Sequence, residues 1–579
     1  MHTKVKSNLK GDAATVSRYL STLELNVLKW MGREFNHAAL GVSLLLFFVA
    51  AATFLKSGVF VAGVMLNDTL LYTESAYRLV HGQLPGIDFS SAHGVFWYVP
   101  LAIAYHLTGD LVRSVPISFV VFAGIIFILA AYIAWTRLGM ILGVTVVLFC
   151  SLFVMAPWAV GFKVSPQGST HTTAAMGYNR LGFTVVLLVS LLAILPRAHR
   201  RLLAARCDVV FAIICFALAF YTKMPFGLGA AGMFLLWAVL LRRERRLWMM
   251  FSLACVLIVA AVECFAPGLH WSYVGEMAMH AQINQAVNAH AVAGAILATL
   301  PEMTVVCLIP VLALATHGDC DWRRLVFFLC LVSGSLVLLT YSYQGPYLIA
   351  PLAIAVIAVS DLTNRGSKSP EGMALWGAMC ALLFGMCTYF TPAVQAIVRH
   401  AWYASRSVAI DHMPATYASL RVPTEIDLDP MDQAFSGRLN GAQAYEAARA
   451  TEPLSTVNAL FENEYAHTLT DLPAARLLCG RAGNRTAIMD FANVSSSLLG
   501  HPPVAGYSYA HFMRGFSEAI HWPAERMFAS VDCLFDPKLA DVPSSKRGLW
   551  LVYGAFISDA FTVVGETTYW RVLVRKGTG

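Results

Sequence analysis

The feature that most constrains the fold of this 579-residue chain is a series of long apolar stretches. A helix must present roughly 17–25 apolar residues to cross a hydrocarbon core about 30 Å thick. Eleven runs approach this length, so we expect about eleven membrane-spanning helices. The runs lie near 38–62, 115–136, 139–158, 181–196, 208–222, 225–241, 247–266, 299–316, 325–341, 346–360 and 373–391.

The composition also indicates a membrane protein. Hydrophobic residues make up 58% of the chain and charged residues 13%, whereas a soluble domain is roughly 45–50% apolar and about 25% charged. Residues 1–391 hold 25 Lys and Arg against 16 Asp and Glu, while residues 392–579 hold 16 against 18. This pattern excludes an ordinary soluble enzyme, a disordered chain and a nucleic-acid-binding module.

The short apolar segment 94–108 decides the orientation of the chain. If it crosses the membrane, the basic cluster at 197–206 faces outward. If it lies on the membrane surface, every basic loop faces inward. In the second arrangement the N-terminal tail and inner loops carry 19 Lys and Arg residues, and the outer loops and helix ends carry 6. The positive-inside rule favours the second arrangement.

The charge count therefore predicts three regions. Residues 1–37 form a cytoplasmic tail, in which Val16 to Met31 has the spacing of a helix lying on the membrane surface. Residues 38–391 form a polytopic α-helical membrane domain, with its outer loops at 63–114, 159–180 and 267–298. Residues 392–579 are expected outside the cytoplasm.

The first outer loop contains three acidic residues of interest, namely Asp68, Glu74 and Asp88. One interpretation is structural, because Asn67 or Asp68 can cap a helix that continues through Ala76. The other is chemical, because a partly buried carboxylate beside the membrane can act as a general base. The residues alone leave both interpretations open.

The pattern Asp68-x3-Tyr72-x-Glu74, with Gly82, Asp88-Phe89 and Gly94 following, resembles the first periplasmic loop of the GT-C superfamily. These membrane glycosyltransferases, among them aminoarabinose transferases and protein mannosyltransferases, use polyprenyl-phosphate sugars. The chain departs from the aminoarabinose-transferase pattern in having Thr69 in place of a second acid. It also has His93-Gly94-Val95 where many members have Gly-Pro or Lys-Pro.

The resemblance implies a catalytic role for the three acids. Asp68 would be the base that deprotonates the acceptor, Glu74 would orient the acceptor or the neighbours of Asp68, and Asp88 would be a weaker member of the same cluster. The family also implies an inverting displacement and membrane-surface helices in this loop. A divalent cation among the loop acids is left open.

The phosphate of such a donor requires cations and N–H or O–H donors. The second outer loop ends in Tyr178, Asn179 and Arg180, and Lys223 lies between two apolar runs at the outer face. Each has a structural alternative, because Tyr and Arg anchor helices at the membrane interface and Lys can extend toward it. The expected substrate-binding residues are Tyr72, His93, Tyr178, Asn179, Arg180, Lys223, Gln344 and Tyr347.

Residues 392–579 are predicted to form a soluble, mixed α/β domain. The pattern predicts strands at 486–492, 549–554 and 569–576 and helices at 441–453 and 467–480. Cys479 and Cys533 could pair in an oxidising compartment. Asn-x-Ser/Thr sequons begin at Asn67, Asn484 and Asn493, and the first adjoins the expected base. This favours a bacterial inner membrane over a glycosylating lumen.

The sequence therefore predicts a GT-C-like glycosyltransferase that transfers a sugar from a polyprenyl-phosphate donor to a glycan, lipid or protein acceptor. The alternative is a polytopic transporter or flippase of lipid-linked glycans, which would need polar residues deep in several spans. Glu263 and Asp208 are the candidates for that role. A polymerase or ligase of lipid-linked glycans is a third possibility, and the sequence names neither the sugar nor the acceptor.

Overall fold

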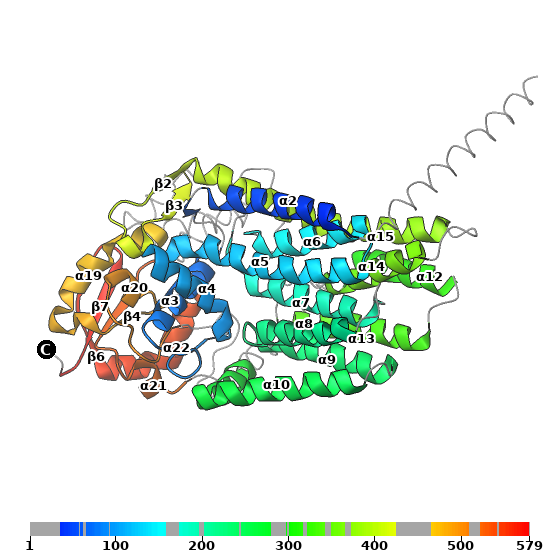
Figure 1. Ribbon diagram of the computed structural model, residues 1–579. Helices are drawn as coiled ribbons and strands as arrows, with labels where there is room; N and C mark the ends of the chain where they lie inside the picture. The colour runs from blue at the N-terminus through cyan, green and yellow to red at the C-terminus, as the bar shows by residue number, and fades with distance from the viewer. Residues whose placement is uncertain are drawn as a thin grey trace, which may run out of the picture.

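A computed structural model shows a helical bundle with a smaller mixed unit at one end (Figure 1). The structure describes residues 35–56, 58–61, 65–91, 93–157, 173–195, 202–241, 245–279, 297, 300–316, 321–341, 349–364, 372–423, 465–508, 522–540 and 543–577.

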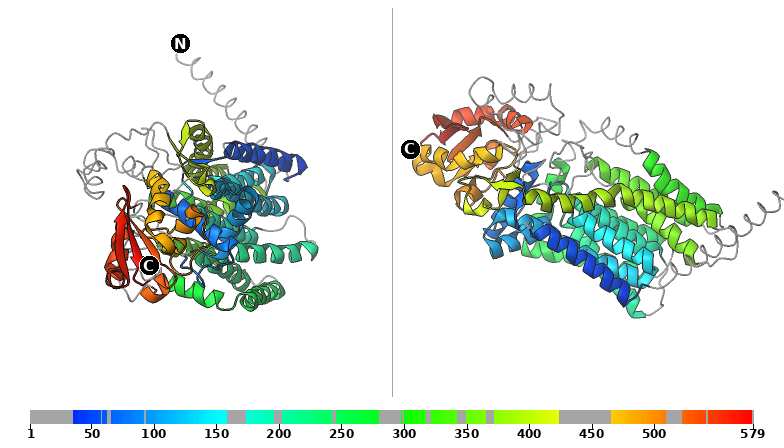
Figure 2. Two further views of the ribbon diagram at one scale, coloured as in Figure 1. Left: turned by 90° about the vertical axis from the view of Figure 1, so that its left-hand side faces the viewer. Right: turned by 90° about the horizontal axis from the view of Figure 1, so that it is seen from above.

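The bundle consists of apolar helices that run roughly side by side along its length (Figures 1 and 2). They are α2 (His37–Leu55), α5 (Leu111–Arg137), α6 (Met140–Met155), α7 (Gly177–Ile194), α8 (Leu202–Phe220), α9 (Met224–Leu241), α10 (Arg245–Phe265), η1 (Thr304–Leu308) with α12 (Ile309–Thr316), α13 (Trp322–Tyr341), α14 (Ile349–Asn364) and α15 (Gly372–Ala404). Each of the eleven apolar runs overlaps one of these helical segments.

Length and hydropathy together select the helices that could cross a membrane. Among the described residues, four are long and apolar enough to cross a membrane alone, or five if the bent pair Met249–Phe265 and Leu269–Met279 counts as one span. The two halves of that pair meet at an angle of 103°. Several further apolar helices, such as Met140–Met155, have only 10–17 described residues, so the number of eleven spans stays a prediction.

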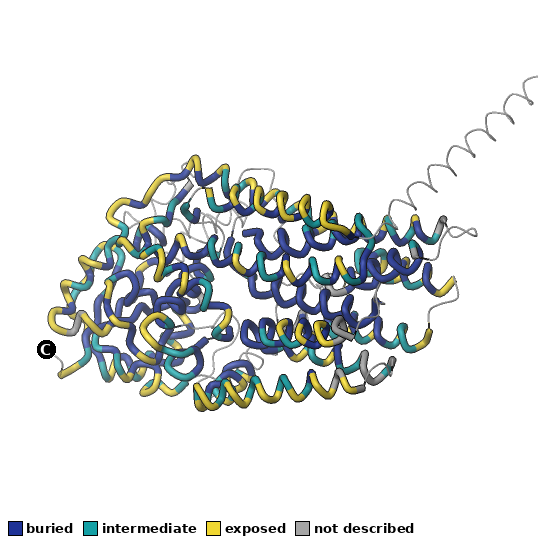
Figure 3. The backbone as a smooth tube through the Cα atoms, in the orientation of Figure 1, coloured by how far each residue is buried: buried dark blue, intermediate teal, exposed yellow. Residues whose placement is uncertain are grey.

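Burial follows the expectation for a bundle in lipid (Figure 3). Helix α7 is buried along its whole length, whereas α2 exposes Val42, Leu45 and Phe48 on its outward face. Exposed apolar side chains on the outside and a packed centre are what a helix bundle surrounded by lipid requires.

The first outer loop forms two short helices at the end of the bundle, α3 (Leu66–Val80) and α4 (Val95–Thr108). Helix α4 ends at Gly109, which has φ +70°, and Asp110 then caps α5 by accepting hydrogen bonds from the amides of Val112 and Arg113. Figure 1 places α3 and α4 between the bundle and the C-terminal elements. Residues 95–108 are thus a helix of 14 residues, too short to cross alone.

The described residues after α15, which we call the C-terminal unit, contain a four-stranded sheet in the order β4-β5-β7-β6. Its strands are β4 (Thr486–Ile488), β5 (Cys533–Pro537), β6 (Phe561–Glu566) and β7 (Trp570–Arg575), and only the β4–β5 pair is parallel. Its helical elements are η2 (Ala415–Tyr417), η4 (Leu469–Asp471), α19 (Leu472–Leu478), η5 (Gly480–Asn484), α20 (Ser495–Leu499), α21 (Ala524–Phe528) and α22 (Pro543–Ala560).

A second, small sheet ties the membrane part to the C-terminal unit. Strand β1 (Phe60–Val61) pairs in parallel with β3 (Leu420–Pro423), which pairs antiparallel with β2 (Ser407–Ala409). Cys479 and Cys533 form a disulfide that joins the end of α19 to β5.

One expectation for this region is corrected. The segment 549–554 is predicted as a strand but lies in α22, where Leu549, Val552 and Tyr553 are buried with the spacing of one helical face. Residue 391, the predicted end of the membrane domain, lies within α15, which continues to Ala404. The predicted helix at 441–453 lies outside the described residues.

Candidate active site

The candidate site is built around Asp68 in the first turn of α3. Asp68 accepts a hydrogen bond of 3.3 Å from the Tyr72 hydroxyl, one turn further along the same helix. The backbone amide of Met176 also donates to its carboxylate, and Lys223 is the cation that acts on it. Asp68 as a whole residue is partly exposed, unlike its fully buried neighbour Glu74 on α3.

Lys223 comes from the turn between α8 and α9 and is buried. Its ammonium group donates a hydrogen bond of 3.2 Å to the Asn179 side-chain oxygen. It also lies 4.5 Å from the centre of the Tyr178 ring, a cation–π distance. The fold thus brings together residues that are more than 100 positions apart, Asp68 and Lys223, with Asn179 between them in sequence.

Aromatic side chains form the walls of the site. The Tyr178 ring lies 4.0 Å from the His93 ring and 6.4 Å from the Tyr72 ring. Trp97 meets Tyr72 edge-on at 5.4 Å. The Tyr98 hydroxyl lies 3.3 Å from Nδ1 of His93. Such rings exclude water and strengthen the electrostatic interactions of the charges they surround.

Arg180 adds a second buried cation. Its guanidinium donates to the Ala175 carbonyl at 3.3 Å and lies 5.6 Å from the centre of the Phe119 ring. Its charge also acts on Tyr72. With one partly exposed acid and two cations, the site carries a net positive charge that suits an anionic ligand.

The two helices that begin at this site, α3 and α7, are each preceded by a methionine with a positive φ angle. Met65 precedes α3 and Met176 precedes α7, and both have positive φ angles, 65° and 61°. This backbone conformation is costly for a residue with a side chain and is found mainly at functional sites. It turns the chain so that the N-terminal end of each helix, where the backbone dipole is positive, carries the site residues in its first turn.

Two glycines allow the close approach of the elements that hold these residues. A Cβ atom at Gly94 would lie 2.2 Å from the Tyr221 carbonyl oxygen, and the Gly94 amide donates to the Thr222 carbonyl at 2.9 Å. This contact fixes the turn that carries Lys223. A Cβ atom at Gly177 would lie 2.5 Å from the Phe119 ring, so α7 can begin here only without a side chain.

The local environment brings the pKa values of the acid and the base toward neutrality. Burial raises the pKa of Asp68 from 3.8 to about 6, although the Tyr72 hydroxyl, the charge of Lys223 and the Met176 amide lower it. Burial lowers the pKa of Lys223 from 10.5 to about 7, against the opposing effect of Asp68. An acid that is ionised yet basic near pH 7 is suited to remove a proton.

An apolar cavity of about 510 Å³ lies among the bundle helices. It is bounded by α7, α9, α13 and the helix Leu269–Met279. On α9 it extends from Met224, the residue after Lys223, to Met233, which corresponds to roughly 13 Å along the helix axis. The residue that follows the site cation Lys223 in the sequence therefore lines an apolar cavity.

The other two acids have different partners from Asp68. Glu74 is fully buried and binds Arg78 at 3.0 Å and the Ser497 hydroxyl at 2.6 Å. Asp88 accepts a hydrogen bond of 2.8 Å from the Leu84 amide and closes a turn. Each of the three carboxylates therefore serves a separate contact. Among the described residues, no three His, Cys, Asp or Glu side chains lie close enough to hold a metal ion.

Most of the expected substrate-binding residues gather at the site, namely Tyr72, His93, Tyr178, Asn179, Arg180 and Lys223. Gln344 and Tyr347 lie outside the described residues. Sequence reasoning missed the Met176 amide, which has no side-chain signal. It also missed Tyr98, because the sequence of α4 contains several aromatic residues and nothing in it distinguishes Tyr98 from the others.

Comparison with known proteins gives structural similarity only. No protein-family model matches the chain, and no curated protein matches it. The crystal structure of ArnT from Cupriavidus metallidurans bound to undecaprenyl phosphate is similar at 14% identity and a TM-score of 0.45, over 92% of this chain and 98% of that chain. The same protein in the apo state gives 15% identity and a TM-score of 0.43, over 93% and 98%.

Proposed function

We propose that the chain is an integral membrane glycosyltransferase of the GT-C type, which transfers a sugar from a polyprenyl-phosphate donor to an extracytoplasmic glycan, lipid or protein. The observation that carries the proposal is the juxtaposition of Asp68, whose carboxylate has a raised pKa, with Lys223, which directly precedes a residue that lines an apolar cavity. A general base, a cation for phosphate and a channel for a lipid tail are the three parts that this reaction needs.

In the proposed reaction the acceptor hydroxyl or amine attacks the anomeric carbon of the donor sugar. The bond from that carbon to the phosphate oxygen breaks, and the lipid phosphate leaves with the electron pair. Asp68 takes the proton of the acceptor nucleophile. Because the acceptor displaces the phosphate in a single step from the opposite side, the anomeric configuration is inverted. Positioning of the two substrates and proton removal together lower the barrier.

Lys223 and Arg180 are proposed to bind the phosphate, and Asn179 fixes the Lys223 ammonium group by the hydrogen bond at 3.2 Å. As negative charge develops on the leaving phosphate, buried cations stabilise it more strongly than exposed ones would. The cavity between α7, α9 and α13 would take the first isoprene units of the lipid.

The disulfide supports the proposed orientation. Disulfides persist in oxidising compartments and are rare in the cytosol, so the Cys479–Cys533 bond favours a C-terminal unit outside the cytoplasm. Asp68 lies at the same end of the bundle, since α3 contacts this unit. With a bacterial inner membrane as the site, the chemistry would take place at the periplasmic face.

A transporter or flippase is less well supported. The acids that sequence reasoning placed deep in the membrane have structural partners. Asp208 binds Arg137 at 2.7 Å and accepts a hydrogen bond from Tyr132 at 2.7 Å. Glu263 binds His270 at 2.6 Å, at the bend after α10. These pairs hold helices together, whereas alternating access needs polar groups that bind cargo.

The test uses the purified full chain in lipid nanodiscs with a radiolabelled polyprenyl-phosphate pentose or hexose and an envelope extract as acceptor. We expect formation of a labelled glycoside and release of the lipid phosphate. Asp68→Asn should lower the rate by about 10²–10⁴-fold. Asp88→Asn is the matched control, because an Asn oxygen can still accept the bond from the Leu84 amide. Normal turnover in Asp68→Asn would refute the assignment of the base.

A transporter would behave differently in the same system. In vesicles it would move the labelled lipid between leaflets without forming a glycosidic bond. Detection of that movement together with an absence of labelled glycoside would favour the alternative.

A further inference from the structure

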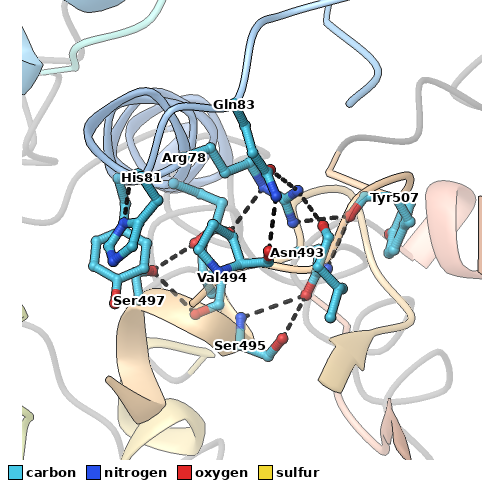
Figure 4. Close-up of polar contacts among 12 residues, drawn as sticks. Arg78, His81, Gln83, Asn493, Val494, Ser495, Ser497 and Tyr507 are labelled. Carbon is cyan, nitrogen blue, oxygen red and sulfur yellow. Dashed lines mark hydrogen bonds and ion pairs between the residues drawn. The ribbon is translucent and has the colours of Figure 1, made fainter. Parts of the chain in front are cut away.

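Helix α3 has contacts of two kinds along its length. Asp68 in its first turn belongs to the candidate site, whereas Glu74 and Arg78 in its later turns are both fully buried against the C-terminal unit. Figure 4 shows Arg78 and Gln83 facing Asn493 and Tyr507, which lie before and after α20 in the sequence. Helix α3 therefore both carries the proposed base, Asp68, and forms buried hydrogen bonds with the C-terminal unit.

We call the interactions of Glu74 and Arg78 with this unit the α3 clamp. Oε2 of Glu74 accepts a hydrogen bond of 2.6 Å from the Ser497 hydroxyl. The Arg78 guanidinium binds Oε1 of Glu74 at 3.0 Å, the Val504 carbonyl at 2.7 Å and the Tyr507 carbonyl at 3.1 Å. The guanidinium lies between α3 and two backbone carbonyls from a segment more than 420 positions away.

Further hydrogen bonds extend the clamp along α3. The Tyr77 hydroxyl donates to the His501 carbonyl at 3.0 Å. The Tyr417 hydroxyl lies 2.9 Å from the Ser497 hydroxyl and 3.1 Å from that of Thr73, which joins one turn of α3 to α20 through a second tyrosine. Four positions of α3 are thus each bonded to the C-terminal unit, namely Thr73, Glu74, Tyr77 and Arg78.

The polar contacts of the clamp fix the rotation of α3 about its axis and do more than hold the helix against the C-terminal unit. An apolar contact would hold α3 against this unit and tolerate rotation of the helix. A buried ion pair is costly unless its hydrogen bonds are satisfied, and those bonds are directional. Here Glu74 and Arg78 are satisfied from both sides only when α3 has one rotation about its axis.

The required precision follows from helix geometry. Six residues separate Asp68 from Glu74, which is about 9 Å along the axis. A side chain lies about 5 Å from that axis, so a rotation of α3 by roughly 20° would move the Asp68 carboxylate by about 2 Å. A displacement of 1 Å at a reacting group can lower the rate by about 10²-fold.

We infer that Glu74, Arg78 and Ser497 are positioning residues, through which the C-terminal unit sets the rotation of α3 and so the direction of the Asp68 carboxylate toward the substrates. This inference rests on the proposed transferase function. It gives the C-terminal unit a part in the chemical step, although none of its described residues supplies the base.

The test compares two serines of the same short helix. Ser497→Ala removes the hydroxyl that reaches Glu74. Ser495→Ala is the matched control, because its equally buried hydroxyl bonds only within the C-terminal unit, to the Thr486 carbonyl and the Asn493 side chain. We expect Ser497→Ala to lower kcat about 10-fold or more with the KM for the donor lipid changed less than about 2-fold. Ser495→Ala should keep kcat within about 2-fold.

Hydrogen exchange separates positioning from stability and from the transferase proposal. In Ser497→Ala the amides of α3 should exchange faster than in wild type, and in Ser495→Ala they should not. Tyr417→Phe should repeat the Ser497→Ala result, because it removes the hydroxyl that bridges Ser497 and Thr73. Equal effects of the two serine variants on kcat and on α3 exchange would overturn the inference. Wild-type protein without transfer activity would count against the proposed function, and the exchange comparison would still decide the clamp.

Discussion

Replacement of Asp68 by Asn should lower the rate of transfer by about 10²–10⁴-fold and at the same time stabilise the folded protein. Burial raises the pKa of Asp68 from 3.8 to about 6, so the folded state disfavours the carboxylate that the reaction needs. Each factor of ten in that protonation equilibrium is worth about 1.4 kcal/mol, which gives about 3 kcal/mol as the upper limit. Because Asp68 is partly exposed, screening by solvent reduces the expected gain to about 1–3 kcal/mol.

The sign of the effect depends on pH. A group whose pKa is raised in the folded state destabilises that state above the folded pKa and has no effect below the unfolded pKa. The stability gain of Asp68→Asn should therefore be complete at pH 8, decrease as the pH falls through 6 and vanish below about pH 4. At pH 8 Lys223, with a pKa of about 7, is mostly neutral and contributes little to the difference.

The assay is thermal unfolding of wild type and Asp68→Asn in one detergent between pH 4 and pH 8, with transfer activity measured on the same preparations. We expect a higher unfolding midpoint for the variant at pH 8 together with loss of transfer. A pH-independent difference, or a lower midpoint at pH 8, would refute the argument that burial of the carboxylate sets its pKa. Activity without a stability gain would refute the role of Asp68 as base.

Three further predictions concern the surroundings of the base. In wild type we expect kcat/KM to fall above about pH 7, because the charged form of Lys223 binds the phosphate and is lost there. Lys223→Arg should remove this alkaline decrease, and an unchanged decrease would exclude Lys223 as its source. Gly94→Ala should disrupt the site, since its Cβ would lie 2.2 Å from the Tyr221 carbonyl, and should lower the unfolding midpoint by an amount that corresponds to at least about 1–3 kcal/mol of overpacking. Cys479 and Cys533 should resist a membrane-impermeant maleimide in spheroplasts until a reductant is added, and Cys479→Ser should cost about 2–5 kcal/mol; labelling without reductant would contradict the disulfide.

The periodicity and hydropathy of the chain predict much of the bundle. Each of the eleven apolar runs overlaps a helix of the described residues, because a continuous apolar stretch in lipid can satisfy its backbone only by internal hydrogen bonding. The same reasoning failed for 549–554, where a short apolar run belongs to the helix α22. A run of six residues fits a strand and a buried helix equally well, and only the packing of its neighbours decides.

The sequence also indicated that the acidic residues of the first outer loop are important, but it did not show that each of them has a different role. Asp68, Glu74 and Asp88 are alike in sequence terms, being acids of one outer loop. Asp68 meets Lys223 and the Met176 amide, Glu74 meets Arg78 and Ser497, and Asp88 closes a turn. These partners come from distant segments or from the backbone, so no local pattern could separate the three acids.

The sequence by itself determined that this chain crosses a membrane, because apolar length and the placement of Lys and Arg are properties of single segments. It also placed Asp68, Tyr178 and Lys223 at one face. Only the tertiary structure decided that Asp68 stays partly exposed and that Glu74 is buried in hydrogen bonds with Arg78 and Ser497. Burial and pairing depend on contacts such as that between Glu74 and Ser497, 423 positions apart, which exist only after the chain has folded.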